Sequence, residues 1–439
     1  MTGIEVGLFS VLAILILIYS GLYVPVALGL VSFASVWYLR DSLDAPVYLV
    51  TLAASNSLED YVFGVIPLFV LMGLLVSHSQ MGRDIYEVAN QLLRRLRGGL
   101  GVATVVANAA FAAITGVSIA SASVFSRVAV PEMTRFGYNP RFAVGVVAGS
   151  SVLGMLIPPS VMLIIYAIIT EQSVAALFKA GIIPGLILAL AYIVGIVAMA
   201  TVFPSYIGGQ KLQTDAEFLR SRMSSKELVG KTAPLVILIL LVLGGIYGGV
   251  FTPTEAGAVG ALGALIIALI KRKLDRRILW EVLAETGHIV ASILMLIVAA
   301  TMYSRMLAIS GLPNELGDWI SQTELGLYGI LAIYVAILIV LGTILDTTSI
   351  ILIMVPLFLP VMAPFDINLI WFGIITIVGA EIGLLTPPLG ISCYVIKSTL
   401  DDDSISLYDI FAGAFPFAVI MLLVLIILIA FPALSLILV

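Results

Sequence analysis

The sequence predicts an all-α polytopic membrane protein with two inverted-topology repeats, each with five crossings, one re-entrant hairpin and one interrupted helix. Composition, an internal duplication and the distribution of basic residues support this. The 439 residues are 61% hydrophobic and 11% charged, with a mean hydropathy of +1.19. Soluble domains are about 45–50% apolar and about 25% charged, so a soluble enzyme is excluded. At about 20 residues per crossing, the chain has room for roughly a dozen spans.

Other bulk features exclude further classes. The net charge is −5 and no basic tail is present, so we expect lipid but no nucleic acid around the protein. The single Cys393 cannot form an internal disulfide, and His78 and His288 are too isolated for a transition-metal site. The N-terminus lacks the basic segment of a signal peptide and is expected to form a first membrane helix.

The internal duplication is visible as landmarks that recur in the same order about 229 residues apart. They are Gly21-x3-Pro25-x3-Gly29 with Gly249-x3-Pro253-x3-Gly257, Gly82 with Gly311, Pro131 with Pro360, Pro158-Pro159 with Pro387-Pro388, and Ala180-Gly181 with Ala412-Gly413. The repeats are therefore residues 1–210 and 231–439, joined by a polar stretch around 211–230.

Each repeat is expected to contain the same elements in the same order: three apolar runs, an amphipathic helix, an interrupted stretch, a broken helix and a last helix. In the first repeat they lie at 4–20, 25–39, 61–78, 82–97, 99–131, 141–170 and 180–203. In the second repeat they lie at 232–248, 254–270, 288–307, 312–323, 326–361, 369–399 and 408–436.

The interrupted stretches predict re-entrant hairpins. Residues 99–113 would form a helix of roughly 22 Å, which is too short for a hydrocarbon core of about 30 Å. The polar tip that follows, Thr115-Gly116-Val117-Ser118, suggests a return to the same side. Residues 325–341 with the tip 342–349 read likewise. Each repeat then has five crossings, and an odd number inverts the second repeat.

The basic residues agree with this topology when the N-terminus is periplasmic. Cytoplasmic segments then carry 18 of the 21 Lys and Arg residues, as the positive-inside rule requires. These are Arg83, Arg94, Arg95, Arg97, Arg127, Arg135, Arg141, Lys211, Arg220, Arg222, Lys226, Lys231, Lys271, Arg272, Lys273, Arg276, Arg277 and Lys397.

Paired hairpins and paired broken helices are typical of secondary transporters. A helix broken inside the membrane leaves carbonyl and N–H groups without partners, and these are tolerated where they line a cavity or bind an ion. The first candidate site joins the tip 115–118 and Ser121 to the breaks around 149–151 and 158–160. Capping and kinking are the alternative roles for the same residues.

The second candidate site joins Gly342 and the tip 346–349 to Gly379, Glu381 and the break at 386–388. Asp346 lies in an apolar run, where a charge costs about 2.5–3.5 kcal/mol on insertion scales, so it is a functional candidate. It could also cap the second hairpin helix, and both roles could hold. Glu381 is either a site residue or a buried structural partner. Glu255 is expected to cap a helix at the outer surface.

The sequence also excludes ATP as an energy source and gives no sign of hydrolytic chemistry. No G-x-x-x-x-G-K-[ST] loop is present, so the chain does not hydrolyse ATP. No H-E-x-x-H or G-x-S-x-G motif points to hydrolysis within the membrane.

Several motifs, in this order, resemble the large membrane subunit of TRAP (tripartite ATP-independent periplasmic) transporters. They are GVSIASASVFSRVAVPEMTRFGY, AGSSVLGMLIPPS, LFKAGIIPG, GVFTPTEAGAVGA and LLTPPLGISCYVIK. The resemblance covers essentially the whole chain. The Ser-Asn-Thr tips of the related divalent-anion/Na⁺ symporters are absent.

The resemblance implies Na⁺-driven uptake of an organic anion across the bacterial inner membrane. It implies a periplasmic substrate-binding protein and a small four-helix membrane subunit, which we expect to be a separate chain. It also implies at least two Na⁺ sites where the hairpin tips meet the broken helices, and no organic cofactor. The residues carried over by motif are Thr115, Gly116, Ser118, Gly149, Pro158, Gly342, Asp346, Thr347, Gly379, Thr386 and Pro387.

The implied mechanism is an elevator. Residues 99–170 and 326–399 would move as transport units, and 1–98, 171–325 and 400–439 would form the scaffold. Na⁺ at both tips would complete an anion site that includes Ser118, Ser121, Thr348 and Ser349. The main alternative is a Na⁺/organic-anion symporter that works without a binding protein; a channel and a non-transporting scaffold are weaker alternatives.

Overall fold

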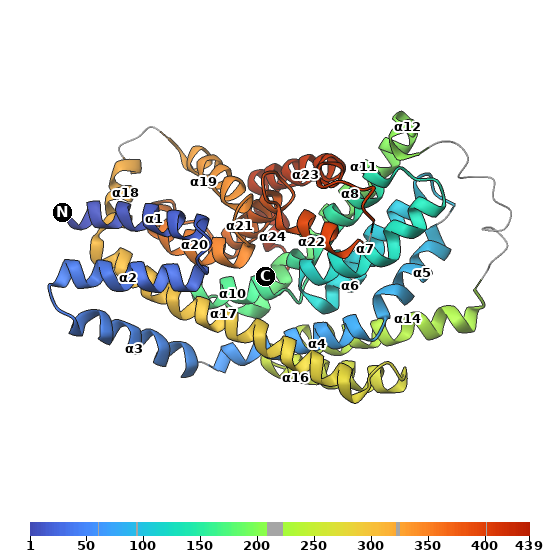
Figure 1. Ribbon diagram of the computed structural model, residues 1–439, viewed down its shortest axis with the longest axis horizontal. Helices are drawn as coiled ribbons and strands as arrows, with labels where there is room; N and C mark the ends of the chain where they lie inside the picture. The colour runs from blue at the N-terminus through green and yellow to red at the C-terminus, as the bar shows by residue number, and fades with distance from the viewer. Residues whose placement is uncertain (60, 94, 209–222, 322–324, 401) are drawn as a thin grey trace.

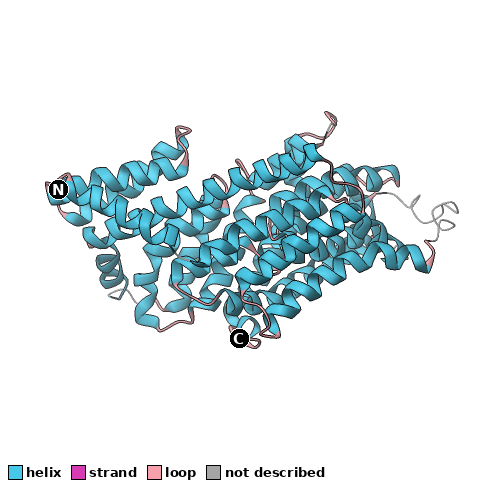
Figure 2. Cartoon of the chain, turned by 90° about the horizontal axis from the view of Figure 1, so that it is seen from below, coloured by secondary structure: helices cyan, strands magenta, loops and turns pink. Residues whose placement is uncertain are grey.

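The computed structural model describes residues 1–59, 61–93, 95–208, 223–321, 325–400 and 402–439. Within these ranges the chain forms helices joined by short loops and contains no strand (Figure 2), which confirms the all-α prediction. Arg94, Lys211, Arg220, Arg222 and most of the predicted linker 211–230 lie outside the described residues.

The helices follow the predicted order. The first half contains α1 (Gly3–Tyr19), α2 (Val24–Arg40), α3 (Asp44–Glu59), α4 (Val65–His78), α5 (Met81–Leu93), α6 (Gly99–Thr115), α7 (Ser118–Arg135), α8 (Pro140–Ser151), α9 (Leu153–Leu156), α10 (Val161–Thr170), α11 (Val174–Val202) and α12 (Pro204–Ile207). The second half contains α14 (Ser225–Ile239), α15 (Gly245–Tyr247), α16 (Pro253–Ile270), α17 (Arg276–Ser310), α18 (Leu312–Ser321), α19 (Leu327–Gly342), α20 (Thr347–Met362), α21 (Leu369–Leu384), α22 (Ile391–Thr399), α23 (Leu407–Ala430) and α24 (Ala433–Leu436).

The chain is a polytopic membrane protein. Six described helices are long and apolar enough to cross a membrane, or up to eight spans if each of two bent pairs counts as one. Five further apolar helices are shorter, and they include α6 and α19. The assignment of ten crossings and two re-entrant hairpins stays a prediction.

The predicted elements omit one helix and begin another too late. Residues 44–59 form α3, which the apolar runs miss because this helix is polar as well as apolar. Its start signal was present: the Ser42 hydroxyl accepts the backbone N–H of Asp44, and Pro46 follows in the first turn. Likewise α17 begins at Arg276, capped by Asp275, and not at 288.

The outer group of helices contains helices of both halves packed against one another. Figure 1 shows the long α17 beside α2 and α3, and α4 beside α16. The second half thus supplies at least one neighbour to each of α1, α2, α3 and α4. Glycines allow close contact here: a Cβ added to Gly260 of α16 would lie 2.5 Å from the Met72 sulfur of α4.

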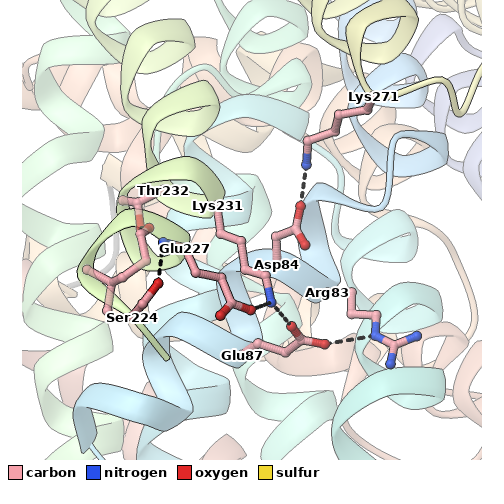
Figure 3. Close-up of polar contacts among 9 residues, drawn as sticks. Arg83, Asp84, Glu87, Ser224, Glu227, Lys231, Thr232 and Lys271 are labelled. Atoms are coloured by element: carbon pink, nitrogen blue, oxygen red, sulfur yellow. Dashed lines mark hydrogen bonds and ion pairs between the residues drawn. The ribbon is translucent and has the colours of Figure 1, made fainter. Parts of the chain in front are cut away.

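Ion pairs fasten α5 to the second half (Figure 3). Lys231 of α14 donates to Glu87 of α5 at 2.6 Å and also pairs with Glu227 at 3.1 Å. Asp84 of α5 pairs with Lys271 at the end of α16. Because Glu87 and Lys231 are 144 residues apart and Asp84 and Lys271 are 187 apart, these two pairs fix α5 against two helices of the other half.

An inner group contains the interrupted elements. We call α6–α7 hairpin 1 and α19–α20 hairpin 2. The second helix of hairpin 1, α7, packs on α22, and α20 of hairpin 2 packs on α10. Behind them, α23 packs closely on α8, where a Cβ on Gly145 would lie 2.1 Å from the Gly413 carbonyl oxygen. The helices α11 and α23 make their main contacts with this inner group.

Candidate functional site

The tip of hairpin 1 is seated in the break of the first broken helix. Gly116 adopts φ +63°, and Val117 is extended, so the chain reverses between α6 and α7. A Cβ on Gly116 would lie 2.3 Å from the Pro159 carbonyl oxygen, which explains the glycine. The backbone N–H of Val161, the first residue of α10, donates to the Gly116 carbonyl at 3.3 Å. The tip and the break that were assigned to the first candidate site are therefore in direct contact.

The tip of hairpin 2 meets the second break in the same way. The backbone N–H groups of Leu389 and Gly390 donate to the Thr343 carbonyl at 3.1 and 3.2 Å. One residue earlier, a Cβ on Gly342 would lie 2.7 Å from the Ala380 carbonyl oxygen, so α19 and α21 are in backbone contact. Both tips are thus hydrogen-bonded to the residues that follow a double proline.

Carboxylates distinguish hairpin 2. Asp346 caps α20: one carboxylate oxygen accepts the backbone N–H of Ser349 at 3.2 Å, and the other accepts the Ser349 hydroxyl. The hydroxyl of Thr347 donates to Glu381 of α21 at 2.6 Å. Glu381 is 1% exposed, and its second carboxylate oxygen has no partner among the described residues. Asp346 thus has the capping role, and Glu381 ties the tip to the broken helix.

A cavity of about 1050 Å³ lies between the two tips. Thr115 and Ser118 line it from hairpin 1, and Asp346, Thr347 and Thr348 line it from hairpin 2. The Thr348 hydroxyl also contacts the Met162 sulfur of α10 at 3.6 Å, which joins hairpin 2 to the first broken helix. Five of the predicted site residues are therefore brought to one cavity.

The cavity is where four inner helices begin. Ser118, Val161, Thr347 and Ile391 are the first residues of α7, α10, α20 and α22, and all four line it. The free N–H groups at a helix N-terminus carry partial positive charge and favour anions. The last residues of α6 and α21, Thr115 and Leu384, line it as well. Their carbonyl ends offer the oxygen ligands that a hard cation such as Na⁺ requires.

Other predicted residues lie elsewhere. Gly149 and Gly379 are packing positions, where an added Cβ would lie 2.4 Å from Phe417 and 3.0 Å from Leu338. Ser121 is buried without a hydrogen-bond partner in the described chain, and it does not line the cavity. Ser349 is bound to Asp346 and does not line it either.

The breaks themselves differ in exposure. Pro158 is buried, whereas Pro387 is exposed and Thr386 is half-buried. The Thr115 and Thr386 hydroxyls both donate to carbonyls of their own helices, at 3.1 and 2.8 Å. Their protons are therefore used locally, and only their oxygen lone pairs remain for a ligand.

Sequence reasoning missed most of the outer wall of the cavity. It is formed by one face of α7 and by the outer helices α4, α5 and α17, with side chains that the sequence analysis did not assign to a site. The polar members are His78, Gln80, Arg83, Ser123, Arg127, Glu285, His288 and Ser292. Spacings of three and four residues on α7 and α17 were a signal that could have found them.

Interrupted helices around a cavity that is walled by a separate outer group are typical of membrane transporters of the secondary-transporter class. The comparisons with known proteins specify the family. The chain belongs to the family described as "Tripartite ATP-independent periplasmic transporter, DctM component", whose model matches residues 11–434. The resemblance stated from the motifs is confirmed, and the chain is a transporter component rather than an enzyme.

Relatives span most of the chain. It is 34% identical over 379 residues to the C4-dicarboxylate TRAP transporter large permease protein DctM of Pseudomonas aeruginosa, covering 86% of each chain. It is 29% identical to the sialic acid TRAP transporter large permease protein SiaM of Vibrio cholerae, covering 87% of each. It is 30% identical to the isethionate TRAP transporter permease protein DctMQ of Oleidesulfovibrio alaskensis, covering 85% of this chain and 57% of that one.

Solved structures share the fold at low identity. The YdaH transporter of Alcanivorax borkumensis superposes with a TM-score of 0.65 at 14% identity, over 89% of this chain and 90% of that one. MtrF of Neisseria gonorrhoeae superposes with a TM-score of 0.56 at 13% identity, over 88% and 84%.

Proposed function

We propose that this protein carries a small organic anion, a carboxylate or sulfonate, into the cell in symport with Na⁺, after a periplasmic substrate-binding protein has delivered it. The observation that carries the proposal is the start of four helices at one cavity. An anion there would face the N-terminal ends of α7, α10, α20 and α22, each with partial positive charge. Relatives named for C4-dicarboxylates, sialic acid and isethionate support this substrate class.

Na⁺ is proposed to bind where each tip meets its break. The carbonyl ends of α6 and α21 and the Asp346 carboxylate supply oxygen atoms near the anion. Two cations beside one anion would offset the cost of bringing that anion out of water, because opposite charges attract strongly at low dielectric. Binding of Na⁺ and of the anion would then be coupled.

We propose an elevator movement of the inner group against the outer group, and the packing supports it. The sequence-based division placed α11 and α23 with the scaffold, but they pack mainly on α6, α8, α10, α21 and α22. We therefore propose that α11 and α23 move with 99–170 and 326–399. The ion pairs of α5 with α14 and α16 would hold the scaffold together during the movement.

The remaining topology and partners are part of the same proposal. The two halves are inverted repeats in the inner membrane, with the N-terminus periplasmic, as the distribution of Lys and Arg indicates. A small four-helix membrane subunit would complete the transporter. The isethionate relative, of which this chain covers 57%, is named as a single DctMQ protein.

Reconstitution tests the proposal. Proteoliposomes would hold this chain alone, with the small subunit, or with the small subunit and the binding protein, under an inward Na⁺ gradient. Labelled succinate, sialic acid and isethionate serve as probes, after a thermal-shift screen of the binding protein selects among them. We expect uptake only with all three components and only with Na⁺. Na⁺-dependent uptake by the chain alone would instead establish the stand-alone symporter, and uptake without Na⁺ would refute the coupling.

A further inference from the structure

The cavity extends well beyond the hairpin tips along one wall. On α7 its lining runs from Ser118 through Ser123 to Arg127, a span of ten residues or about 13 Å of helix. On the facing wall, Glu285, His288 and Ser292 occupy one face of α17. The cavity is thus longer than the space between the tips requires, and its far part has its own polar lining.

Arg127 is a cation without a partner in this far part. It is exposed, and it makes no ion pair or hydrogen bond within the described part of the chain. The other arginine of the lining, Arg83, donates to Glu87 at 3.0 Å. The remaining ionisable groups of the lining are Asp346 at the tip, Glu285 on α17 and two histidines. Arg127 is therefore the lining cation available to a ligand.

The two halves of the protein differ at this position. Arg127 belongs to a segment that the distribution of basic residues places at the cytoplasmic side. The residue 229 positions later, which corresponds to it in the second repeat, is Pro356 of α20. Only the cytoplasmic side of the tips is therefore provided with a cation on a hairpin helix.

We propose that Arg127 forms a second anion subsite, which takes the carboxylate or sulfonate of the substrate after it leaves the hairpin tips on the way to the cytoplasm. A guanidinium presents a planar fork of donors that matches such groups. An anion held by four helix N-termini leaves more easily when a second, weaker site lies within reach, as in other multi-site permeation pathways. The direction of exit rests on the proposed function, but anion attraction at Arg127 can be measured without transport.

Cysteine labelling measures that attraction. Cys393 is buried, so Cys393→Ser gives a background without cysteine, and Ser123→Cys places a thiol one turn before Arg127 on the same wall. The full chain in inside-out membrane vesicles is labelled with the anionic reagent MTSES or the cationic reagent MTSET. The ratio of the two rates reports the local potential and is insensitive to a general change in access.

We expect Arg127→Gln to lower the MTSES-to-MTSET rate ratio about tenfold, because a unit charge one helical turn away is lost. Arg127→Lys keeps the charge and should stay within about twofold of the parent. The matched control is Arg135→Gln, which removes the same charge from the same helix outside the cavity lining, about 12 Å further on and beyond a Debye length at 0.1 M salt. A fall of less than threefold with Arg127→Gln, or an equal fall with Arg135→Gln, would overturn the subsite.

Counterflow of succinate tests whether the Arg127 subsite takes part in transport. In proteoliposomes with the whole transporter, we expect Arg127→Gln to raise the half-saturating internal succinate concentration at least threefold and leave that for Na⁺ unchanged. An unchanged value for internal succinate, with the labelling ratio lowered, would overturn the role in substrate release. Absence of succinate counterflow by the parent would count against the proposed function with this probe, and the labelling would still decide whether Arg127 attracts anions.

Discussion

The two hairpin tips share a backbone plan but differ in chemistry. In each, the carbonyl of a turn residue accepts N–H groups that follow a double proline. Hairpin 1 is sealed by Gly116, and its neighbour Ser118 is fully buried with a hydroxyl that has no partner in the described chain. Hairpin 2 is held by side chains, with Asp346 as cap and Thr347 bound to Glu381.

The closure of hairpin 1 is therefore limited by steric fit, and the closure of hairpin 2 by electrostatic interactions. Closure of hairpin 1 depends on a backbone approach that only glycine permits. The tip of hairpin 2 has two carboxylates beside it, Asp346 of the tip and Glu381 of α21, so the occupancy of a nearby cation would change its stability. We infer that hairpin 2 is the tip more sensitive to Na⁺, and four predictions test this contrast, from the largest expected effect to the smallest.

Gly116→Ala should have the largest effect. The added Cβ would lie 2.3 Å from the Pro159 carbonyl oxygen, and φ is +63°. We expect uptake to fall by about 100-fold or more, because hairpin 1 cannot seat on the break. The matched control is Gly249→Ala, where φ is +69° but no atom lies within 4 Å. It should cost only about 1–2 kcal/mol of stability and leave uptake within about twofold. Equal uptake by the two variants would contradict the steric role.

Glu381 should give the next largest effect. Glu381→Ala leaves the Thr347 hydroxyl without its acceptor and opens a void, which costs about 2–4 kcal/mol, so uptake and thermal stability should both fall. Glu381→Gln keeps an acceptor oxygen and removes the charge. We expect it to retain thermal stability and to lower uptake about tenfold. Wild-type uptake and stability in Glu381→Ala would remove Glu381 from the account of hairpin 2.

Substitutions of Asp346 distinguish its role as a helix cap from the role of its charge. Asparagine caps helices as well as aspartate, so Asp346→Asn should keep the start of α20 and its stability. We expect the Na⁺ concentration for half-maximal uptake to rise about five- to tenfold, because a carboxylate is lost beside the cation. Asp346→Ala should show the same shift with a lower rate and stability. If Asp346→Ala keeps the wild-type rate and Na⁺ dependence, Asp346 has no role in coupling.

The smallest effect is expected at a cap outside the cavity. Thr252 and Glu255 form a capping box at the start of α16, with mutual hydrogen bonds of 3.3 and 2.8 Å. Glu255→Ala should cost about 1 kcal/mol and lower Tm by about 1–2 °C. Uptake and its Na⁺ dependence should stay within about twofold of wild type. If Glu255→Ala shifts the Na⁺ dependence as much as Asp346→Asn does, loss of a helix cap alone alters Na⁺ coupling. Asp346 would then have no special role relative to Glu255.

The tips and breaks of this site could be predicted from the sequence, because particular residues mark them. Pro158-Pro159, Pro387-Pro388 and the polar tips stand out in apolar runs, because proline and charge are costly inside a membrane unless they serve a purpose. Glu255 was correctly expected to be a cap. The helix α3 was missed because it is neither uniformly apolar nor strongly periodic, and hydropathy detects only helices of those kinds.

The sequence by itself determined the class of the protein, the order of its helices and the positions of its tips and breaks. These properties reside in local patterns of hydropathy, glycine, proline and charge. Only the tertiary structure decided which residues share the cavity. Thr115 and Ser118 meet Thr347 and Thr348, more than 200 positions away, because α7 packs on α22 and α20 packs on α10. For the same reason Gly149 and Gly379 serve packing, and Arg127 faces the cavity: long-range contacts, which no local pattern encodes, set the direction of each helix face.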